Sequence, residues 1–392
     1  MRLTQPPPEP TAGGSSSVAT RPKSPQSLAW KASLTAHFLL LRALYQGRIG
    51  EDNKVKLVLK SLYNLIDDST DKGYLDAMRE SGGIVEVRTP SGPPQSLYVQ
   101  STPINVLYTL TYLTTIVSRR EFLGSSATCR TLVHSRAMRE WEDVARADDF
   151  WDSGFSQVHG LAEALRMRKV MATLKAEGMM EEALAHIIRS SFAEADKVLT
   201  DTVRHLRRCN LFNSHLPQLS LLYAQFTHVL GLSDSAVRYY RAAQSMITPG
   251  SELRLVVDVG LLSASGGLEG LRDSHERSQY VNMLADACRS GNNALLSAVG
   301  SFLSSLTETE RVISKRFLSN AYELARKGNL NVLHCLIFAF TTGAHVYGDS
   351  ERQLKQLESG RSIAQMLGGM DRADNVGQTI LGLWYAVKLR GE

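Results

Sequence analysis

The sequence has few cysteines, and none of them stands at a metal-binding spacing. Cys129, Cys209, Cys288 and Cys335 are far apart, and no Cys-x-x-Cys pair occurs. A structural zinc site or a disulfide framework needs closely spaced or paired cysteines, so we expect neither. Unpaired, scattered cysteines favour a reducing compartment, and we therefore predict an intracellular protein.

Long apolar runs are also missing. The N-terminus has no apolar signal core, and the longest apolar runs, such as residues 333–340, are far too short to cross a bilayer. Charged residues make up 21% of the chain and hydrophobic residues 43%, a balance typical of soluble proteins. We predict a soluble protein that makes no contact with a membrane.

Motifs of the common enzyme classes are absent. No His-Glu-x-x-His, no Gly-x-Ser-x-Gly and no dinucleotide fingerprint occurs. Gly266, Gly267 and Gly270 lie close together, but no Gly-Lys-Ser/Thr follows them, which argues against a phosphate loop. His334 stands beside Cys335 within an apolar helix, where packing in the core is favoured over metal binding. The sequence therefore predicts a protein that is no enzyme and has no cofactor, no metal site and no small-molecule substrate.

A strong excess of one charge is missing as well. The net charge is +5, and basic clusters occur at residues 119–120, 166–169 and 204–208. Basic side chains on the outer face of an amphipathic helix are usually plain solvated surface. No aromatic residues are interleaved with them, as a stacking platform for nucleic acid would require. Direct contact with DNA stays open.

What the sequence does contain is helical periodicity, most clearly over residues 330–388. Two helices are predicted, one over Leu330–Tyr347 and one that ends at Gly368-Gly369, and a third follows with Trp384 on its apolar stripe. Apolar residues three and four apart put one stripe on each helix, and each stripe must be buried against a neighbour. Helices of similar size joined by tight glycine turns are typical of a stacked helical-hairpin solenoid.

The same unit recurs upstream, at Leu219–Met246. Gly231 falls at the turn between its two helices, and Ala236, Tyr240 and Ala243 follow at the spacing of the second helix of a tetratricopeptide repeat. A third copy, Met179–His205, places Ala195 and Leu199 correctly but lacks the glycine. We therefore predict an all-α fold, a tetratricopeptide-like helical-hairpin solenoid wound as a right-handed superhelix.

Two segments depart from this pattern. Residues 1–27 are rich in Pro, Ser, Thr and Gly, so they are predicted to form a disordered tail before a solenoid that covers residues 28–392. Residues 82–103 hold two short β-like runs, 84–87 and 97–100. A small extended insertion is predicted there, either a hairpin or an extended loop, and a floppy surface loop is the alternative. Before it, Leu34, Phe38, Leu41 and Tyr45 are expected to form the apolar stripe of the first helix.

A solenoid binds partners along its concave side, which we expect the first helix of each pair to line. The candidates for a partner groove are Arg42, Tyr45, Tyr108, Tyr112, Tyr223 and Phe226. Aromatic side chains give a large contact area at a small cost in rotamer entropy. The alternative is that most of them belong to the core between repeats. Trp384 is expected to cap the last pair rather than to recognise a partner.

The C-terminal third resembles the cohesin-loading factor family. The resemblance lies in the stretches 321–330, 339–350 and 362–371 and in Leu383-Trp384. In that family a Gly-His-x-Phe-x-x-x-Gly-Asn/Asp turn precedes a Leu-Ala-x-Lys-x-x-Asp helix end, and the matching positions here are Gly343, His345, Tyr347, Gly348, Asp349, Ile363, Ala364 and Asp371. The insertion at 82–103 resembles the arrangement in fungal members. Family members usually have several more N-terminal repeats, so we expect this chain to be short at its N-terminus.

The resemblance implies a function as well as a fold. Proteins of that family are the tetratricopeptide subunit of the cohesin loader, and they clasp the extended N-terminal segment of the large HEAT-repeat loader subunit. The implied role is a non-catalytic scaffold in the nucleus that supports the loading of cohesin onto chromatin, and so sister-chromatid cohesion and chromosome segregation in mitosis. The alternative is a generic tetratricopeptide adaptor in another assembly, such as a ubiquitin ligase or a transcription complex.

Overall fold

The structure, a computed structural model, describes residues 25–74, 84–88, 96–100, 102–119, 129–147, 161–266 and 275–345, together with Glu358. The predicted N-terminal tail starts outside these ranges, and the final helix with Trp384 lies outside them. The residues matched to the family motif from Tyr347 onward lie outside them as well.

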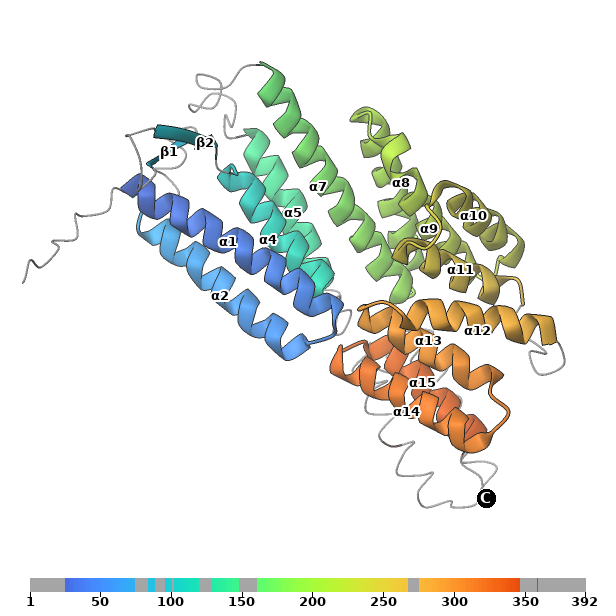
Figure 1. Cartoon of the computed structure of the whole chain (residues 1–392). Coiled ribbons are helices and arrows are strands. Elements are labelled where there is room, and N and C mark those ends of the chain that lie inside the picture. The colour runs from blue at the N-terminus through green and yellow to red at the C-terminus, as the bar shows by residue number, and fades with distance from the viewer. Residues whose placement is uncertain are drawn as a thin grey trace, which may run out of the picture.

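The described residues form thirteen helices and two short strands (Figure 1), which confirms the all-α solenoid. The helices are α1 (Pro25–Arg48), α2 (Asp52–Asp71), α4 (Ile104–Arg119), α5 (Arg130–Ala147), α7 (Leu161–Ile188), α8 (Phe192–Arg208), α9 (Phe212–Val229), α10 (Ser233–Met246), α11 (Glu252–Ala264), α12 (His275–Arg289), α13 (Ala294–Thr307), α14 (Arg311–Lys327) and α15 (Asn331–His345).

Helix contacts follow the chain, as a solenoid requires. Each helix from α4 onward packs on the next one, and α1 packs on α2. The first helices of successive pairs, which are α1, α4, α7, α9, α11 and α13, also contact one another in that order. The first helices therefore form one continuous row, with the second helices α2, α5, α8, α10, α12 and α14 paired to them.

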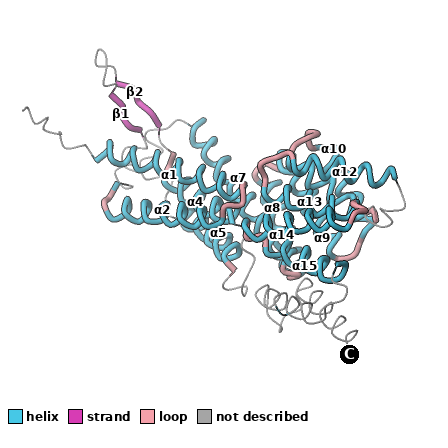
Figure 2. Tube along the Cα trace, turned by 60° about the horizontal axis from the view of Figure 1, so that its bottom comes forward, coloured by secondary structure: helices cyan, strands magenta, loops and turns pink. Residues whose placement is uncertain are grey.

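The predicted extended insertion is a two-stranded hairpin. Strand β1 (Ile84–Arg88) pairs antiparallel with β2 (Ser96–Gln100), so that Glu86 lies opposite Tyr98. The hairpin contacts α1 and projects at the end of the molecule where α1 begins (Figure 2). Among the described residues it is the only sheet.

Five helix ends share one turn geometry, with a left-handed residue after the helix. The next N–H donates to the carbonyl five residues back, which is the bond of a Schellman motif. The left-handed residues are Gly50, Ser190, Asn210, Gly231 and Asn329, with φ between 55° and 75°. The glycine that the third repeat copy lacks is thus replaced by Ser190, and Asn329 rather than Gly328 carries the turn after α14.

Helix α7 extends past the predicted start of the third repeat copy. The sequence predicted a repeat copy that begins at Met179, but α7 runs unbroken through that position from Leu161 to Ile188. Gly178 lies inside it, and a Cβ at that position would come 2.9 Å from the terminal carbon of Met138 on α5. This glycine therefore makes room for a neighbouring helix and does not end its own.

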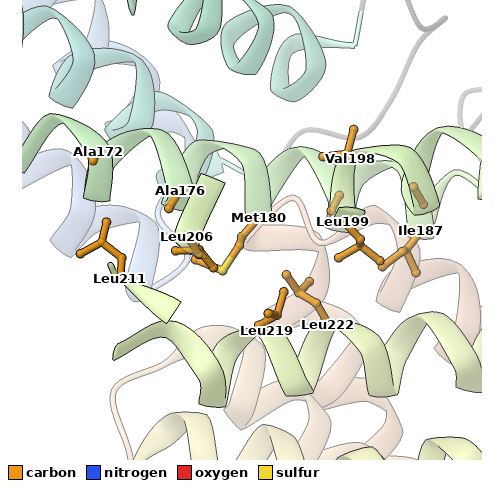
Figure 3. Packing of buried hydrophobic residues seen from close by; sticks show 12 residues of the cluster. Ala172, Ala176, Met180, Ile187, Val198, Leu199, Leu206, Leu211, Leu219 and Leu222 are labelled. Carbon is orange, nitrogen blue, oxygen red and sulfur yellow. The ribbon is translucent and has the colours of Figure 1, made fainter. Parts of the chain in front are cut away.

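The central core joins three consecutive helices (Figure 3). It contains Ala172, Ala176 and Met180 from α7, Val198, Leu199 and Leu206 from α8, and Leu219 and Leu222 from α9. Small residues on α7 face large ones on α8 and α9, so the helices approach closely without leaving a void. This core links the pair α7–α8 to the first helix of the next pair.

The buried side of helix α1 consists mostly of small side chains, together with Leu40. Ala29, Ser33, Ala36 and Ala43 lie on its buried side, spaced four, three and seven residues apart. At its end Gly47 meets α4 so closely that a Cβ would lie 2.5 Å from the carbonyl oxygen of Ser118. Large side chains complete this contact, because Leu40 of α1 is buried with Leu59 and Leu62 of α2 and Leu107 of α4.

The turn between α1 and α2 folds back onto the C-terminal pairs, and we call this the closing contact (Figure 1). Arg48 Nη2 lies 2.6 Å from Glu252 Oε1 at the start of α11, and Lys327 Nζ lies 2.6 Å from Glu51 Oε1. The hydrogen bond from Lys327 holds the pKa of Glu51 below its ordinary value. Residues more than 200 positions apart thus close the described part of the solenoid on itself.

Gly50 provides a test of the closing contact. Its φ is +75°, and a Cβ there would lie 2.7 Å from the Cβ of Ala294. Gly231 has the same φ, but a Cβ there would have nothing within 4 Å, so Gly231→Ala measures the cost of the backbone conformation alone. We expect Gly231→Ala to lower the free energy of unfolding by about 1–2 kcal/mol and Gly50→Ala by about 1–3 kcal/mol more.

The measurement is chemical denaturation, with hydrogen exchange at the start of α13 and the end of α14 as the local readout. Gly50→Ala should raise exchange at both places, whereas Gly231→Ala should not. Equal losses of stability for the two variants would show that the closing contact contributes nothing.

Candidate partner-binding surface

All six predicted groove residues lie on first helices, but they differ in accessibility. Arg42 and Tyr45 on α1 are exposed. The other four are half-buried: Tyr108 and Tyr112 on α4, and Tyr223 and Phe226 on α9. Helix α4 packs on α1, so four of the six come from one neighbourhood, whereas the two on α9 belong to a later pair.

The two aromatics on α9 are part of the packing between pairs. Both contact the central core. The ring of Tyr223 stacks on Tyr239 with 5.7 Å between centroids, and Phe226 lies 6.3 Å from the ring of Phe192. Burial also raises the pKa of the Tyr223 hydroxyl. These contacts are those of side chains that hold neighbouring helices together.

The two tyrosines on α4 are tied to adjacent helices. The hydroxyl of Tyr108 is 3.1 Å from Thr70 Oγ1 on α2. The ring of Tyr112 lies 5.7 Å from the ring of His134 on α5. Both therefore have partners within the fold, and they leave α1 as the site of the two exposed candidates.

Helix α1 carries an exposed line of large apolar residues. Leu34 is 50% exposed, Phe38 61%, Leu41 68% and Tyr45 58%. We call these four residues the α1 stripe. They were expected to form the apolar stripe of the first helix, and such a stripe normally packs on a neighbouring helix. The buried side of α1 instead carries Ala29, Ser33, Ala36, Leu40 and Ala43.

The charged side chains that α1 itself places beside the stripe are basic. Helix α1 contains no Asp or Glu, and the exposed side chains beside and beyond the stripe include Lys31 and Arg42. Large apolar residues usually mark the buried side of a helix, so their pattern alone does not predict that this stripe is exposed. The signal that could have shown its true orientation is the second line of Ala and Ser at similar spacing on the same helix.

A buried polar cluster joins α5 to α7. Glu182 is buried, pairs with Arg139 of α5, and has its Oε1 3.9 Å from Nε2 of His186. Burial raises the pKa of Glu182 against the opposing effect of Arg139, and burial lowers the pKa of His186 to about 4. His186 is therefore neutral at neutral pH, and the cluster is internal to the helix packing.

The thiols of Cys288 and Cys335 and the ring of His334 also lie in the core. Burial raises the pKa of Cys288 to about 11 and that of Cys335 to about 12, so neither is a thiolate near pH 7. His334 packs edge-on against the ring of Tyr322, with 4.4 Å between centroids. Within the described ranges, no group of three or more His, Cys, Asp or Glu is arranged to hold a metal ion.

Taken together, the row of helical pairs places the chain in the α-solenoid class. The family model described as cohesin loading factor matches residues 19–370. The chain therefore belongs to the cohesin loading factor family, which gives it a role in cohesin loading and an interaction with the loading machinery. No curated protein and no solved structure matches the chain. None of the helices that the structure describes has the length and apolar character to traverse a bilayer.

Because His186 is buried, the free energy of unfolding should fall as the pH falls from neutral towards 4. Its pKa is about 4 in the folded chain against 6.5 for a free histidine, so the unfolded chain binds the proton first as the pH falls. The resulting stabilisation is present above pH 6.5 and is lost towards pH 4, by up to about 3 kcal/mol. In His186→Gln this part of the pH dependence should vanish.

Urea denaturation of wild type and His186→Gln between about pH 7 and pH 4.5 measures the difference. His275→Gln, at an exposed position, is the matched control and should follow the wild-type curve. Parallel curves for wild type and His186→Gln would contradict the assigned burial of this imidazole.

Proposed function

We propose that this chain is the non-catalytic scaffold subunit of a cohesin loader and that it clasps the N-terminal segment of the large HEAT-repeat loader subunit. The observation that carries the proposal is the family match over residues 19–370 on a chain that is a helical solenoid. Solenoids suit an extended ligand, because successive pairs present similar surfaces in a row over many residues.

The packing supports a clasp rather than a catalyst. The first helices contact one another from α1 through α13, which gives a continuous row for an extended segment to follow. The closing contact joins the first pair to residues of α11, α13 and α14, so the described pairs are held as one body. The buried, neutral His186 and the buried thiols of Cys288 and Cys335 serve packing and not nucleophilic chemistry.

The place of action follows from the proposed role. A subunit that supports cohesin loading onto chromatin works in the nucleus, during the part of the cell cycle that establishes sister-chromatid cohesion. The adaptor alternative, in a ubiquitin ligase or a transcription assembly, lacks a specific observation in its favour, whereas the loader role rests on the family match.

The direct test is co-expression with the large HEAT-repeat loader subunit of the same organism. We expect a stoichiometric complex that survives gel filtration, and no complex when the N-terminal segment of the large subunit is removed. The complex should also raise the amount of cohesin retained on circular DNA after a high-salt wash. If the two purified chains stay separate at micromolar concentration, the proposed function is wrong.

The candidate groove residues separate into binding and packing roles. We expect Tyr45→Ala to weaken the complex and leave the melting temperature unchanged, because this side chain is exposed. Phe226→Ala should do the reverse and lower the free energy of unfolding by about 2 kcal/mol, because its half-buried ring packs on the core. Calorimetric melting and titration of the large subunit give both readouts on each variant. A Phe226→Ala chain that melts like wild type but loses its partner would reverse the assignment.

A further inference from the structure

We infer that the α1 stripe is the docking site for an amphipathic α-helix that carries acidic side chains beside its apolar face. The inference rests on the proposed function, because it places that helix within the N-terminal segment of the large loader subunit. It deepens that function by naming the surface of this chain and the kind of segment that binds there.

Folding alone does not explain the α1 stripe. Single exposed apolar residues are ordinary, but four large ones on one line of one helix form a contiguous patch of the sort that marks interaction sites. Helix α1 already has a buried side, on which Ala36, Leu40 and Ala43 pack against α2 and α4. The large side chains of Phe38 and Leu41 thus remain available to a partner, since they are 61% and 68% exposed within the described fold.

The spacing of the α1 stripe fits a helix as its occupant. The four residues are separated by four, three and four positions, which is the 3-4 alternation of a helix–helix seam. From Leu34 to Tyr45 the stripe runs along α1 for about 16 Å, or roughly three turns. A partner helix of about two heptads would insert its own side chains between these four.

The charge beside the α1 stripe favours an acidic occupant. Helix α1 has no acidic residue, and Lys31 and Arg42 are exposed beside the stripe, so an occupant with acidic flanks gains complementarity. A second copy of α1 would bring like charges together. Residues 1–24 contain one acid, Glu9, and only three large apolar residues, Met1, Leu3 and Val18, so they offer neither the charge nor the apolar seam.

The test is the affinity of the full chain for the N-terminal segment of the large subunit, measured by fluorescence anisotropy. Phe38→Glu and Leu41→Glu should each weaken binding by about tenfold or more. Val312→Glu is the matched control, because Val312 on α14 is 69% exposed and Leu41 is 68% exposed, and it should leave affinity within about twofold. Circular dichroism melts verify that all three variants fold as the wild type does.

Charge is tested separately at Arg42. Arg42→Glu should weaken binding and reduce its dependence on salt, whereas Lys315→Glu, at an exposed position on α14, should change neither. A photo-reactive phenylalanine analogue at position 38 should cross-link to a segment of the large subunit that has apolar residues at 3-4 spacing and acids beside them.

Three outcomes overturn the inference. If wild type binds the segment and the stripe variants bind equally well, the stripe is not the site and the proposed function stands. If wild type does not bind the large subunit at all, both fail. If the analogue at position 38 cross-links only to this chain, within a molecule or in a dimer that Phe38→Glu dissociates, the stripe is an internal or self-association surface.

Discussion

The structure depends on the close approach of neighbouring helices, which small residues permit both within pairs and between them. A Cβ on Gly300 of α13 would lie 2.6 Å from the carbonyl oxygen of Ala285 on α12, and Gly47 meets Ser118 as tightly. Fully buried alanines recur on the second helices, at Ala195, Ala236, Ala243, Ala285, Ala321 and Ala325. Because neighbouring backbones nearly touch, substitution of one of these residues by a larger one separates a whole pair and not a single side chain.

Large side chains are placed where this close approach leaves room. Between pairs they fill gaps, as when Tyr240 of α10 lies against Gly260 of α11, and burial there raises the pKa of its hydroxyl to about 12. On α1 no further described pair lies beyond the first, and the α1 stripe faces solvent, whereas Leu40 on the opposite side is buried in the first pair. One packing rule therefore accounts for both the buried aromatic plugs and the exposed stripe.

This rule also explains which features could be predicted from sequence. The unit at residues 219–246 was predicted with its turn, because Gly231, Ala236 and Tyr240 all signal one local geometry, and the structure places them so. Two other features were predicted wrongly. A repeat was expected to begin at Met179, but α7 runs through that position and its Gly178 packs against α5. The apolar line of α1 was expected to pack on a neighbouring helix, but it is exposed.

Contacts between distant parts of the chain carry no local signal at all. Arg48 and Glu252 are ordinary surface residues in the sequence, and only the curvature of the solenoid brings them to 2.6 Å. The local pattern placed all six candidate groove residues on first helices but could not give their exposure, since the exposure of Tyr45 and the partial burial of Tyr223 depend on which pairs adjoin them.

The closing contact and the α1 stripe are parts of one helix, and this links fold and function. Arg48 lies seven residues after Leu41, on the same line of α1, and its guanidinium is held by Glu252, which also accepts a hydrogen bond from Asn293 at the start of α13. A ligand on the stripe thus lies next to the residues that join the first pair to the last described ones. A ligand that contacts both the stripe and Arg48 and binds better when the closing contact is formed also stabilises that contact. The closing contact in turn raises the affinity for such a ligand by the same factor.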